Sequence, residues 1–220
     1  MGSDDLFNKR KARAQKPHKR DSKNLLPKQV ILIVCEGEKT EKNYFETLKK
    51  QLNLTNANIL IDPDSDSTPS SVVRYAKQKL KQNPNEYDEV YCVFDRDTHK
   101  DFDRALDMAT NFNRAKNTTI ETIVSDPCFE YWILLHFTQT SRCFGQSGGS
   151  PCKEVQEERI FKEKMKNYTK NYNFEEIIET DLKTAIKNAN KVNSQNEAQR
   201  QSPYTQVVHL VERLQKLAMQ

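Results

Sequence analysis

Three acidic residues of this chain follow directly on two short apolar runs. Glu36 comes after residues 30–35, and Asp95 and Asp97 come after residues 89–94. Residues two apart in an extended segment point to the same side, so the two aspartates can converge. Carboxylates gathered in one cleft repel one another, by about 1 kcal/mol per pair at ~4 Å even in bulk water. A divalent cation relieves this repulsion, and Mg²⁺ binds carboxylate and water oxygens while keeping positions for phosphate oxygens.

The chemistry expected from such a site is phosphodiester hydrolysis, because one or two metal ions can generate hydroxide and stabilise the departing oxyanion. The pattern therefore predicts that Glu36, Asp95 and Asp97 hold Mg²⁺ or Mn²⁺ in a nuclease. An Asp-x-Asp pair alone is common in turns, but here it ends one apolar strand while Glu36-Gly37 ends another. The competing interpretation is that these acids are solvated loop residues or helix N-caps, which the positive end of the helix dipole favours.

Alternating strands and helices are needed to bring these acids together. Apolar β-branched runs predict strands, and apolar residues at helical spacing predict helices between them. The alternation indicates an α/β fold, with a parallel sheet and helices on both faces. Right-handed crossovers then place all strand C-termini at one edge, where ligands of such sheets bind. The predicted strands are 30–35, 58–61, 89–94 and 119–124, and the helices are about 40–54, 102–112, 128–137 and one from Pro69 to the Asn83-Pro84 break.

Residue types also predict where the first two helices begin and what they bury. Thr40 and Thr68 are suitable N-cap residues, and Pro69 suits the first helical position. Apolar side chains at helical spacing then predict one buried face on each helix. These side chains are Tyr44, Phe45, Leu48 and Leu52 in the first helix, and Val72, Val73, Ala76 and Leu80 in the second.

The chain changes character after residue 137. Residues 138–152 include the glycine-rich segment 145–150 and are predicted to form a flexible loop. Beyond the loop, the apolar spacing predicts amphipathic helices at 153–166, 182–192 and 204–218. Residues 153–220 are therefore expected to form a helical extension packed on the α/β domain of residues 29–137, rather than a second α/β unit.

The composition indicates a polar, folded protein of the cytoplasm. The chain has 220 residues, of which 35% are hydrophobic and 30% charged, and no apolar run approaches the roughly 20 residues that span a bilayer. The N-terminus lacks an apolar signal core, and five cysteines at irregular spacings suggest reduced thiols rather than a disulfide framework. We expect no zinc site, because Cys143 and Cys152 have no Cys-x-x-Cys or histidine nearby.

The positive charge of the chain is concentrated at its N-terminus. The formal net charge is +4, and residues 1–28 contain nine Lys/Arg and three Asp. This arm is either a solvated, disordered segment or one that follows nucleic-acid phosphates, and the two descriptions are compatible. Lys39 and Arg96 are further candidates for phosphate contact, although surface basic residues are commonly only solvated. The candidates in the arm are Lys9, Arg10, Lys11 and Arg13.

Two residues of the predicted helix 128–137 could also take part. Glu130, near the helix start and among aromatic residues, could face the acidic site, since a buried carboxylate usually needs a metal or base partner. The dipole of the helix explains an acid at this position equally well. His136 could shuttle a proton, but a helix-end histidine between Leu135 and Phe137 is more often structural.

Four ordered blocks of the sequence resemble the RloB family. They are Ile31-Leu-Ile-Val-Cys-Glu-Gly-Glu-Lys-Thr-Glu-Lys-Asn-Tyr-Phe45, Val93-Phe-Asp-Arg-Asp97, Ser125-Asp-Pro-Cys-Phe-Glu-Tyr-Trp-Ile-Leu-Leu-His-Phe137 and Tyr204-Thr-Gln-Val-Val-His-Leu-Val-Glu-Arg-Leu214. The basic N-terminal arm is also usual in that family. The resemblance spans most of the chain.

The resemblance implies a Toprim-like fold, as in topoisomerases, primases and overcoming-lysogenization-defect nucleases. It implies that Glu36 acts as general acid or base and that Asp95 and Asp97 bind Mg²⁺, with Glu130 a candidate for a second ion. It also implies a place in restriction-linked or abortive-infection antiviral defence, often beside a partner ATPase. Asp126 stands where the family often has Asn, which adds a carboxylate near the strand edge.

Two other functions remain open at the level of sequence. The chain could be a non-catalytic nucleic-acid-binding or regulatory subunit of a partner ATPase. It could also be a haloacid-dehalogenase-type phosphatase, with Asp95 as nucleophile and Asp97 as acid/base. Two observations argue against the phosphatase. The motif Asp95-Arg96-Asp97 follows the third predicted strand rather than the first, and no Asp-Asp pair is evident toward the C-terminus.

Overall fold

A five-stranded sheet in the order β2-β1-β3-β4-β5 forms the centre of the protein. The computed structural model describes residues 29–37, 39–54, 57–62, 68–96, 100–115, 119–146 and 148–219. Four strands are parallel, which confirms the predicted α/β class, and the short β5 pairs antiparallel to β4 at the sheet edge. The strands are β1 (Gln29–Cys35), β2 (Ala57–Asp62), β3 (Glu89–Asp95), β4 (Ile120–Asp126) and β5 (Tyr204–Thr205).

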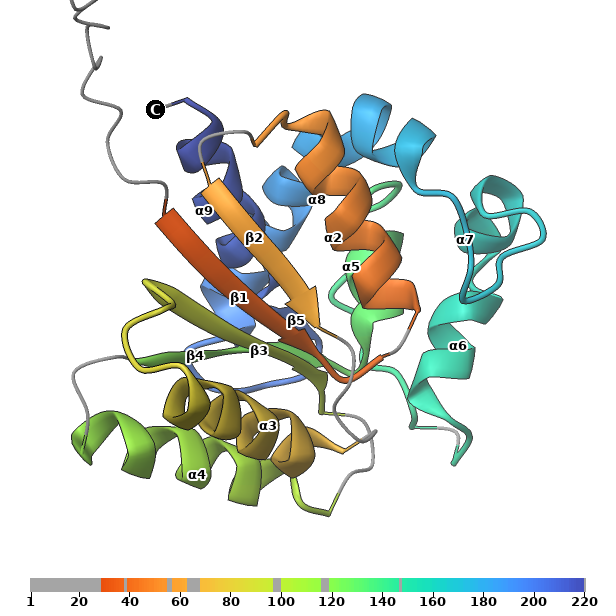
Figure 1. Ribbon diagram of the computed structural model, residues 1–220. Helices are drawn as coiled ribbons and strands as arrows, with labels where there is room; N and C mark the ends of the chain where they lie inside the picture. The colour runs from red at the N-terminus through yellow and green to blue at the C-terminus, as the bar shows by residue number, and fades with distance from the viewer. Residues whose placement is uncertain are drawn as a thin grey trace, which may run out of the picture.

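Helices cover both faces of the sheet (Figure 1). Helices α3 and α4 pack on one face, and α2, α5, α8 and α9 pack on the other. No helix in the described ranges is both long and apolar enough to cross a membrane. The helices are α2 (Thr40–Gln51), α3 (Pro69–Gln82), α4 (Phe102–Ala115), α5 (Phe129–Leu134), α6 (Pro151–Glu157), α7 (Arg159–Lys164), α8 (Glu175–Asn196) and α9 (Val207–Ala218).

The continuous apolar run of β1 is buried on both faces of the sheet. Ile31 and Ile33 belong to the core under α2, α8 and α9, whereas Leu32 and Val34 belong to the core under α3 and α4. Such a run is typical of a strand within a parallel sheet, because neither of its faces meets water. The two cores therefore fix the register of β1, since a shift by one residue would exchange all its side chains between faces.

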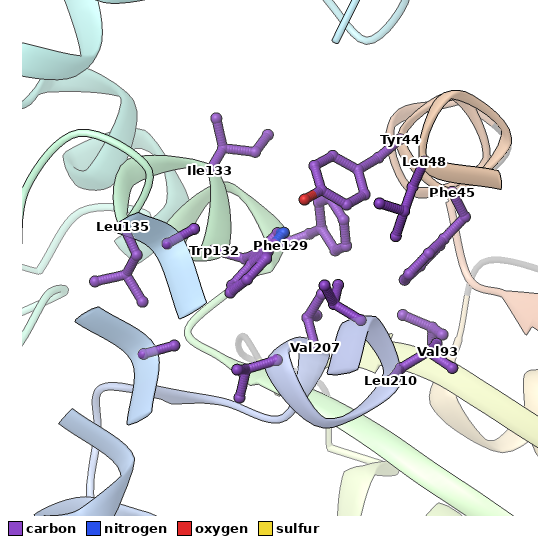
Figure 2. Packing of buried hydrophobic residues seen from close by; sticks show 14 of the residues in the cluster. Tyr44, Phe45, Leu48, Val93, Phe129, Trp132, Ile133, Leu135, Val207 and Leu210 are labelled. Atoms are coloured by element: carbon purple, nitrogen blue, oxygen red, sulfur yellow. The ribbon is translucent and has the colours of Figure 1, made fainter. Parts of the chain in front are cut away.

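The predicted buried face of the first helix is confirmed for Tyr44, Phe45 and Leu48, which are fully buried. Figure 2 shows these side chains pointing from α2 toward Phe129 of α5. The rings of Tyr44 and Phe129 meet edge to face with centroids 5.4 Å apart. Helices α2 and α5, which begin close to the ends of β1 and β4, are thus held together by a shared aromatic core.

The strand order creates a switch point between β1 and β3. Strand β2 lies on one side of β1 and β3 lies on the other, so the two connections leave in opposite directions. In open α/β sheets, ligands bind outside the carboxyl ends of the strands at such a point. Glu36 directly follows β1 and Asp95 is the last residue of β3, so both lie at this edge.

The structure corrects several predicted boundaries in the first half of the chain. Helix α2 ends at Gln51 rather than near residue 54, and Asn53 has the left-handed backbone angle φ 50°. Thr40 is the first residue of α2, with Lys39 at the N-cap position, whereas the predicted Thr68–Pro69 start of α3 is confirmed. Helix α5 ends at Leu134, short of the predicted residue 137.

The second half of the chain differs more from the prediction. The predicted helix 153–166 is two helices, because Glu158 between them has an extended backbone (φ −54°, ψ 133°), and α6 begins at Pro151 inside the predicted loop. Helix α8 extends beyond 182–192 at both ends. Residues 204–205, predicted as helix, form β5, so this region supplies a sheet strand in addition to helices.

Asn193 of α8 explains why residues 204–205 are extended. Its side-chain amide donates to the Thr205 carbonyl oxygen (2.7 Å), and its side-chain oxygen accepts from the Thr205 N–H (3.1 Å). Both residues are buried. The amide therefore takes the place of a neighbouring strand, and β5 is held between α8 and β4.

Replacing Asn193 with alanine should lower the free energy of unfolding by about 2–6 kcal/mol. The reason is that two buried backbone groups of Thr205 would be left without a partner, at about 1–3 kcal/mol each. Urea unfolding followed by circular dichroism measures the change. Asn190→Ala on the same helix is the matched control and should cost far less, because Asn190 is exposed and its amide bonds to the Glu212 carboxylate rather than to a buried backbone group. Equal losses of stability in the two variants would contradict this role of Asn193.

Candidate functional site

A hydrogen bond connects the two acidic strand ends. The Glu36 N–H donates to the Val93 carbonyl oxygen (2.9 Å), so Glu36 continues the pairing of β1 with β3. The Asp95 N–H in turn donates to Glu36 Oε2 (3.0 Å). Glu36 is 9% exposed, and Asp95 is half-buried. The structure thus brings Glu36 and Asp95 together at the switch point, as the sequence predicts.

Several predicted site residues lie outside the described part of the chain. Asp97 is one of them, so its place beside Asp95 remains a prediction. The basic residues of the N-terminal arm, Lys9, Arg10, Lys11 and Arg13, are also outside it. Lys39 is described and exposed, at the N-cap position of α2.

Glu41 is a site residue that the sequence did not single out. It lies in the first turn of α2 and is only 6% exposed. Burial raises the pKa of its carboxyl from 4.5 to about 7, and the charges of Glu130 and Glu36 add to this effect while Lys170 opposes it. The helix dipole alone favours an acid in the first turn of a helix. The sequence therefore gave no separate sign that Glu41 belongs to a site.

Gly37 makes room for the Glu41 carboxylate. A Cβ atom at residue 37 would lie 1.9 Å from Glu41 Oε2 and 2.6 Å from its carboxyl carbon. Any other residue at this position would therefore push the carboxylate away from the turn after β1. The Glu36-Gly37 pair thus has two functions: one residue supplies an acid, and the other lets a second acid approach.

Glu130 is a fourth acid at the same place, and two hydrogen-bond donors hold it. The Tyr168 hydroxyl donates to Glu130 Oε1 (3.1 Å), and so does the Gln156 side-chain amide (3.2 Å). Gln156 belongs to α6, and Tyr168 follows α7, so the region after residue 150 orients this carboxylate. Glu130 also interacts electrostatically with Asp95 and Glu41, so it lies near the acidic strand ends.

Asp95 interacts electrostatically with all these acids. Burial raises the pKa of Asp95 well above its usual range, and nearby negative groups raise it further. In decreasing order these groups are Glu41, Glu130, Cys152 and Glu36. We call Glu36, Glu41, Asp95 and Glu130 the acidic cluster. Its members repel one another, so any cation bound among them is favoured.

Cys152 has neighbours that the sequence did not predict. The ligand atoms of Cys128, Glu130 and Cys152 all lie within 4.8 Å of one another. The sequence search for a Cys-x-x-Cys pair or a histidine near Cys152 did not consider Cys128 and Glu130 as neighbours. Cys128 precedes α5 and Cys152 lies in α6, so only the packing of the two helices brings the thiols together.

Asp126 is not part of the acidic cluster. Its carboxylate accepts from Arg96 Nη1 at 2.8 Å, and the same nitrogen donates to the Arg200 carbonyl oxygen (3.1 Å). The Arg96 guanidinium also lies over the Phe102 ring, 5.7 Å from its centroid. Arg96, a candidate for phosphate contact, is thus paired with the buried Asp126, although its side chain remains partly exposed.

His136 lies in the aromatic core rather than at the acidic cluster. It is fully buried, with Nδ1 3.1 Å from the Trp132 carbonyl oxygen and Nε2 3.2 Å from the Tyr44 hydroxyl. Burial lowers its pKa to about 4, so the ring is neutral near pH 7. A neutral ring satisfies both contacts when Nδ1–H donates to the carbonyl and Nε2 accepts from the hydroxyl. The structure thus favours packing over proton transfer for His136.

The donor set of the acidic cluster fits Mg²⁺. Hard divalent cations prefer carboxylate oxygens, and this cluster gathers carboxylates from the end of β1, the end of β3 and the first turns of α2 and α5. Burial raises the pKa values of Asp95 and Glu41, and the mutual repulsion of the acids raises them further. Glu36, Asp95 and Glu130 are the described residues that would hold such an ion.

Comparison with known proteins identifies the family. The family described as RloB-like protein matches residues 31–214, from β1 to α9. The chain belongs to the RloB-like family. The matched range contains every member of the acidic cluster, together with both cysteines beside it. No curated protein and no solved structure matches this RloB-like chain.

The raised pKa of Glu41 predicts how stability changes with pH. A carboxyl whose pKa is higher in the folded than in the unfolded protein contributes its full stabilisation of the folded state below the unfolded pKa, here 4.5. This contribution is lost as the pH rises toward the folded pKa of about 7. In the absence of divalent cations, the free energy of unfolding should therefore fall across this range by an extra amount on the order of 1–3 kcal/mol.

Glu41→Gln should remove this part of the pH dependence and leave the part due to Asp95, whose pKa is also raised. Urea unfolding at several pH values in the presence of a chelator measures it. Glu46→Gln is the matched control, since Glu46 is an exposed acid of the same helix. If wild type and Glu41→Gln show the same dependence on pH, Glu41 does not hold a proton in the folded protein.

Proposed function

We propose that this RloB-like protein is a divalent-metal-dependent nuclease that hydrolyses phosphodiester bonds of nucleic acid, with Mg²⁺ or Mn²⁺ as its cofactor. The observation that supports the proposal is the bond between the Asp95 amide and the Glu36 carboxylate at the β1–β3 switch point. It holds two acids at the edge where α/β sheets bind ligands. Family membership is compatible with this activity.

The charge of the site explains why a metal would be required. A phosphate group is an anion, and four carboxylates would repel it from the acidic cluster. In this proposal Asp95 and Asp97 hold the ion, and Glu130 contributes to a second position. A bound ion would supply Lewis-acid stabilisation of the phosphate oxygens and of the departing oxyanion.

Two glutamates are candidates for the transfer of protons. The family resemblance favours Glu36, whose carboxylate is fixed by the Asp95 amide. Glu41 is the second candidate, because a carboxyl with a pKa of about 7 can hold or release a proton at neutral pH. The proton at issue is either the one removed from the attacking water or the one delivered to the leaving oxygen.

The proposal is tested by incubating full-length protein with end-labelled DNA and RNA pools in Mg²⁺ or Mn²⁺. Wild-type protein should cut one of them, a chelator should stop the reaction, and Glu36→Gln and Asp95→Asn should each lower the rate by at least ~100-fold. Asp107→Asn is the matched control, because Asp107 is an exposed acid of α4, and it should cut like wild type.

Three results would contradict the proposal. Cleavage that persists in both site variants would exclude these acids. Turnover of small phosphomonoesters in place of nucleic acid would indicate a phosphatase. Tight, metal-independent nucleic-acid binding without cleavage, even with the partner ATPase that the resemblance implies, would indicate a binding or regulatory subunit and would remove the proposed enzymatic part in antiviral defence.

The basic arm is expected to add affinity that does not depend on sequence. Changing Lys9, Arg10 and Lys11 to Gln in the Asp95→Asn background should weaken nucleic-acid binding. It should also reduce the slope of log affinity against log salt by about 0.7–0.9 for each phosphate that the arm no longer neutralises. Fluorescence anisotropy at several salt concentrations measures both changes.

A matched control separates this effect from net charge. Lys183, Lys187 and Lys191 are exposed along α8, and changing them to Gln removes the same three charges. These changes should leave the salt slope near that of the parent protein. Equal slopes for the two triple variants would show that the arm makes no phosphate contacts of its own.

A further inference from the structure

Two thiols and a carboxylate lie together next to the acidic cluster. One ligand atom of each of Cys128, Glu130 and Cys152 lies within 4.8 Å of the others. Cys128 occupies the N-cap position of α5 and is fully buried, while Cys152 is the second residue of α6 and is half-buried. Burial raises the pKa of the Cys128 thiol, and the nearby Cys152, Glu130 and Asp95 raise it further.

The carboxylate of this group is already oriented. The Tyr168 hydroxyl and the Gln156 amide both donate to Glu130 Oε1, so its position does not depend on the thiols. Gln156 lies one turn after Cys152 on α6, and the same short helix thus supplies one sulfur and one donor that fixes the carboxylate. Hydrogen bonds of this kind to ligating carboxylates are a regular feature of metal sites.

The donor types differ from those of the acidic cluster. Thiolates select Zn²⁺ and softer ions, whereas carboxylates and water suit Mg²⁺. Three protein ligands with one position left for water is the arrangement of zinc sites that remain open. Both cysteines are reduced, so their sulfurs are available once deprotonated.

We propose that Cys128, Glu130 and Cys152 bind one Zn²⁺ beside the acidic cluster. Each thiol gives up its proton to solvent as the ion binds, and the two sulfurs and the Glu130 carboxylate become its ligands. Water takes the fourth position. The ion connects the start of α5 to the start of α6. This site does not rest on the nuclease proposal, since it requires no catalysis.

Full-length protein, freed of metals with a chelator and reduced with a phosphine, is titrated with Co²⁺ as the probe. Thiolate ligation gives a charge-transfer absorption in the near ultraviolet that carboxylates alone do not give. One equivalent should saturate the band, about two protons should be released per ion, and Zn²⁺ but not excess Mg²⁺ should displace the cobalt.

Cys152→Ser is the decisive variant, because Cys152 is only half-buried and its replacement disturbs the core less than that of Cys128. It should weaken Co²⁺ binding by at least ~10–100-fold and diminish the band, while its circular dichroism stays that of wild type. Cys143→Ser is the matched control, since Cys143 is exposed and its thiol donates to the Ser202 carbonyl oxygen. It should bind cobalt as wild type does.

Glu36→Gln separates this proposal from the proposed nuclease. It should keep the cobalt band even though it no longer cleaves nucleic acid, so the two proposals can fail independently. Absence of a thiolate band in the wild-type protein would overturn the zinc site. So would a band unchanged in Cys152→Ser, or one diminished equally in Cys143→Ser.

Discussion

The hydrogen bond from the Asp95 amide to the Glu36 carboxylate is the interaction on which the arrangement of the site depends. It joins the ends of β1 and β3 across the switch point, and it can form only if these parallel strands keep their register. The register is set by burial, because alternate residues of β1 enter two different cores. A shift by one residue would turn the apolar side chains to the wrong faces. The hydrophobic cores thus position the acids without touching them.

Repulsion between these acids opposes folding, and several features of the protein reduce this repulsion. Glu41 and Asp95 both have raised pKa values, so each can carry a proton when no cation is present. Gly37 leaves space for one carboxylate, while the Tyr168 hydroxyl and the Gln156 amide hold Glu130. A site that is unfavourable without a cation gains more from binding one, because ligand binding stabilises only the folded state.

The region after residue 150 is part of the site as well as of the scaffold. The sequence predicts it as a helical extension, but α6 supplies Cys152 and Gln156, and Tyr168 follows α7. Helix α8 also fixes β5 through Asn193, and β5 pairs with β4 at Ser125 and Asp126. The family match, which runs through residue 214, covers this region too. Oxygen donors and sulfur donors therefore meet where the α/β domain and the later helices pack together.

The sequence alone was enough to predict the parallel strands, because a strand buried on both faces is a continuous apolar run. It also predicted that Glu36 and Asp95 lie at one edge, because the C-termini of parallel strands share that edge. It could not predict β5, which Asn193 holds from another element. Nor could it separate Asp126, paired with Arg96, from the acids of the cluster. Asp97 and the basic arm stay predictions from the sequence. Only tertiary packing brought Glu41 and the two cysteines into the site, because their partners are distant in the chain or lie across a turn.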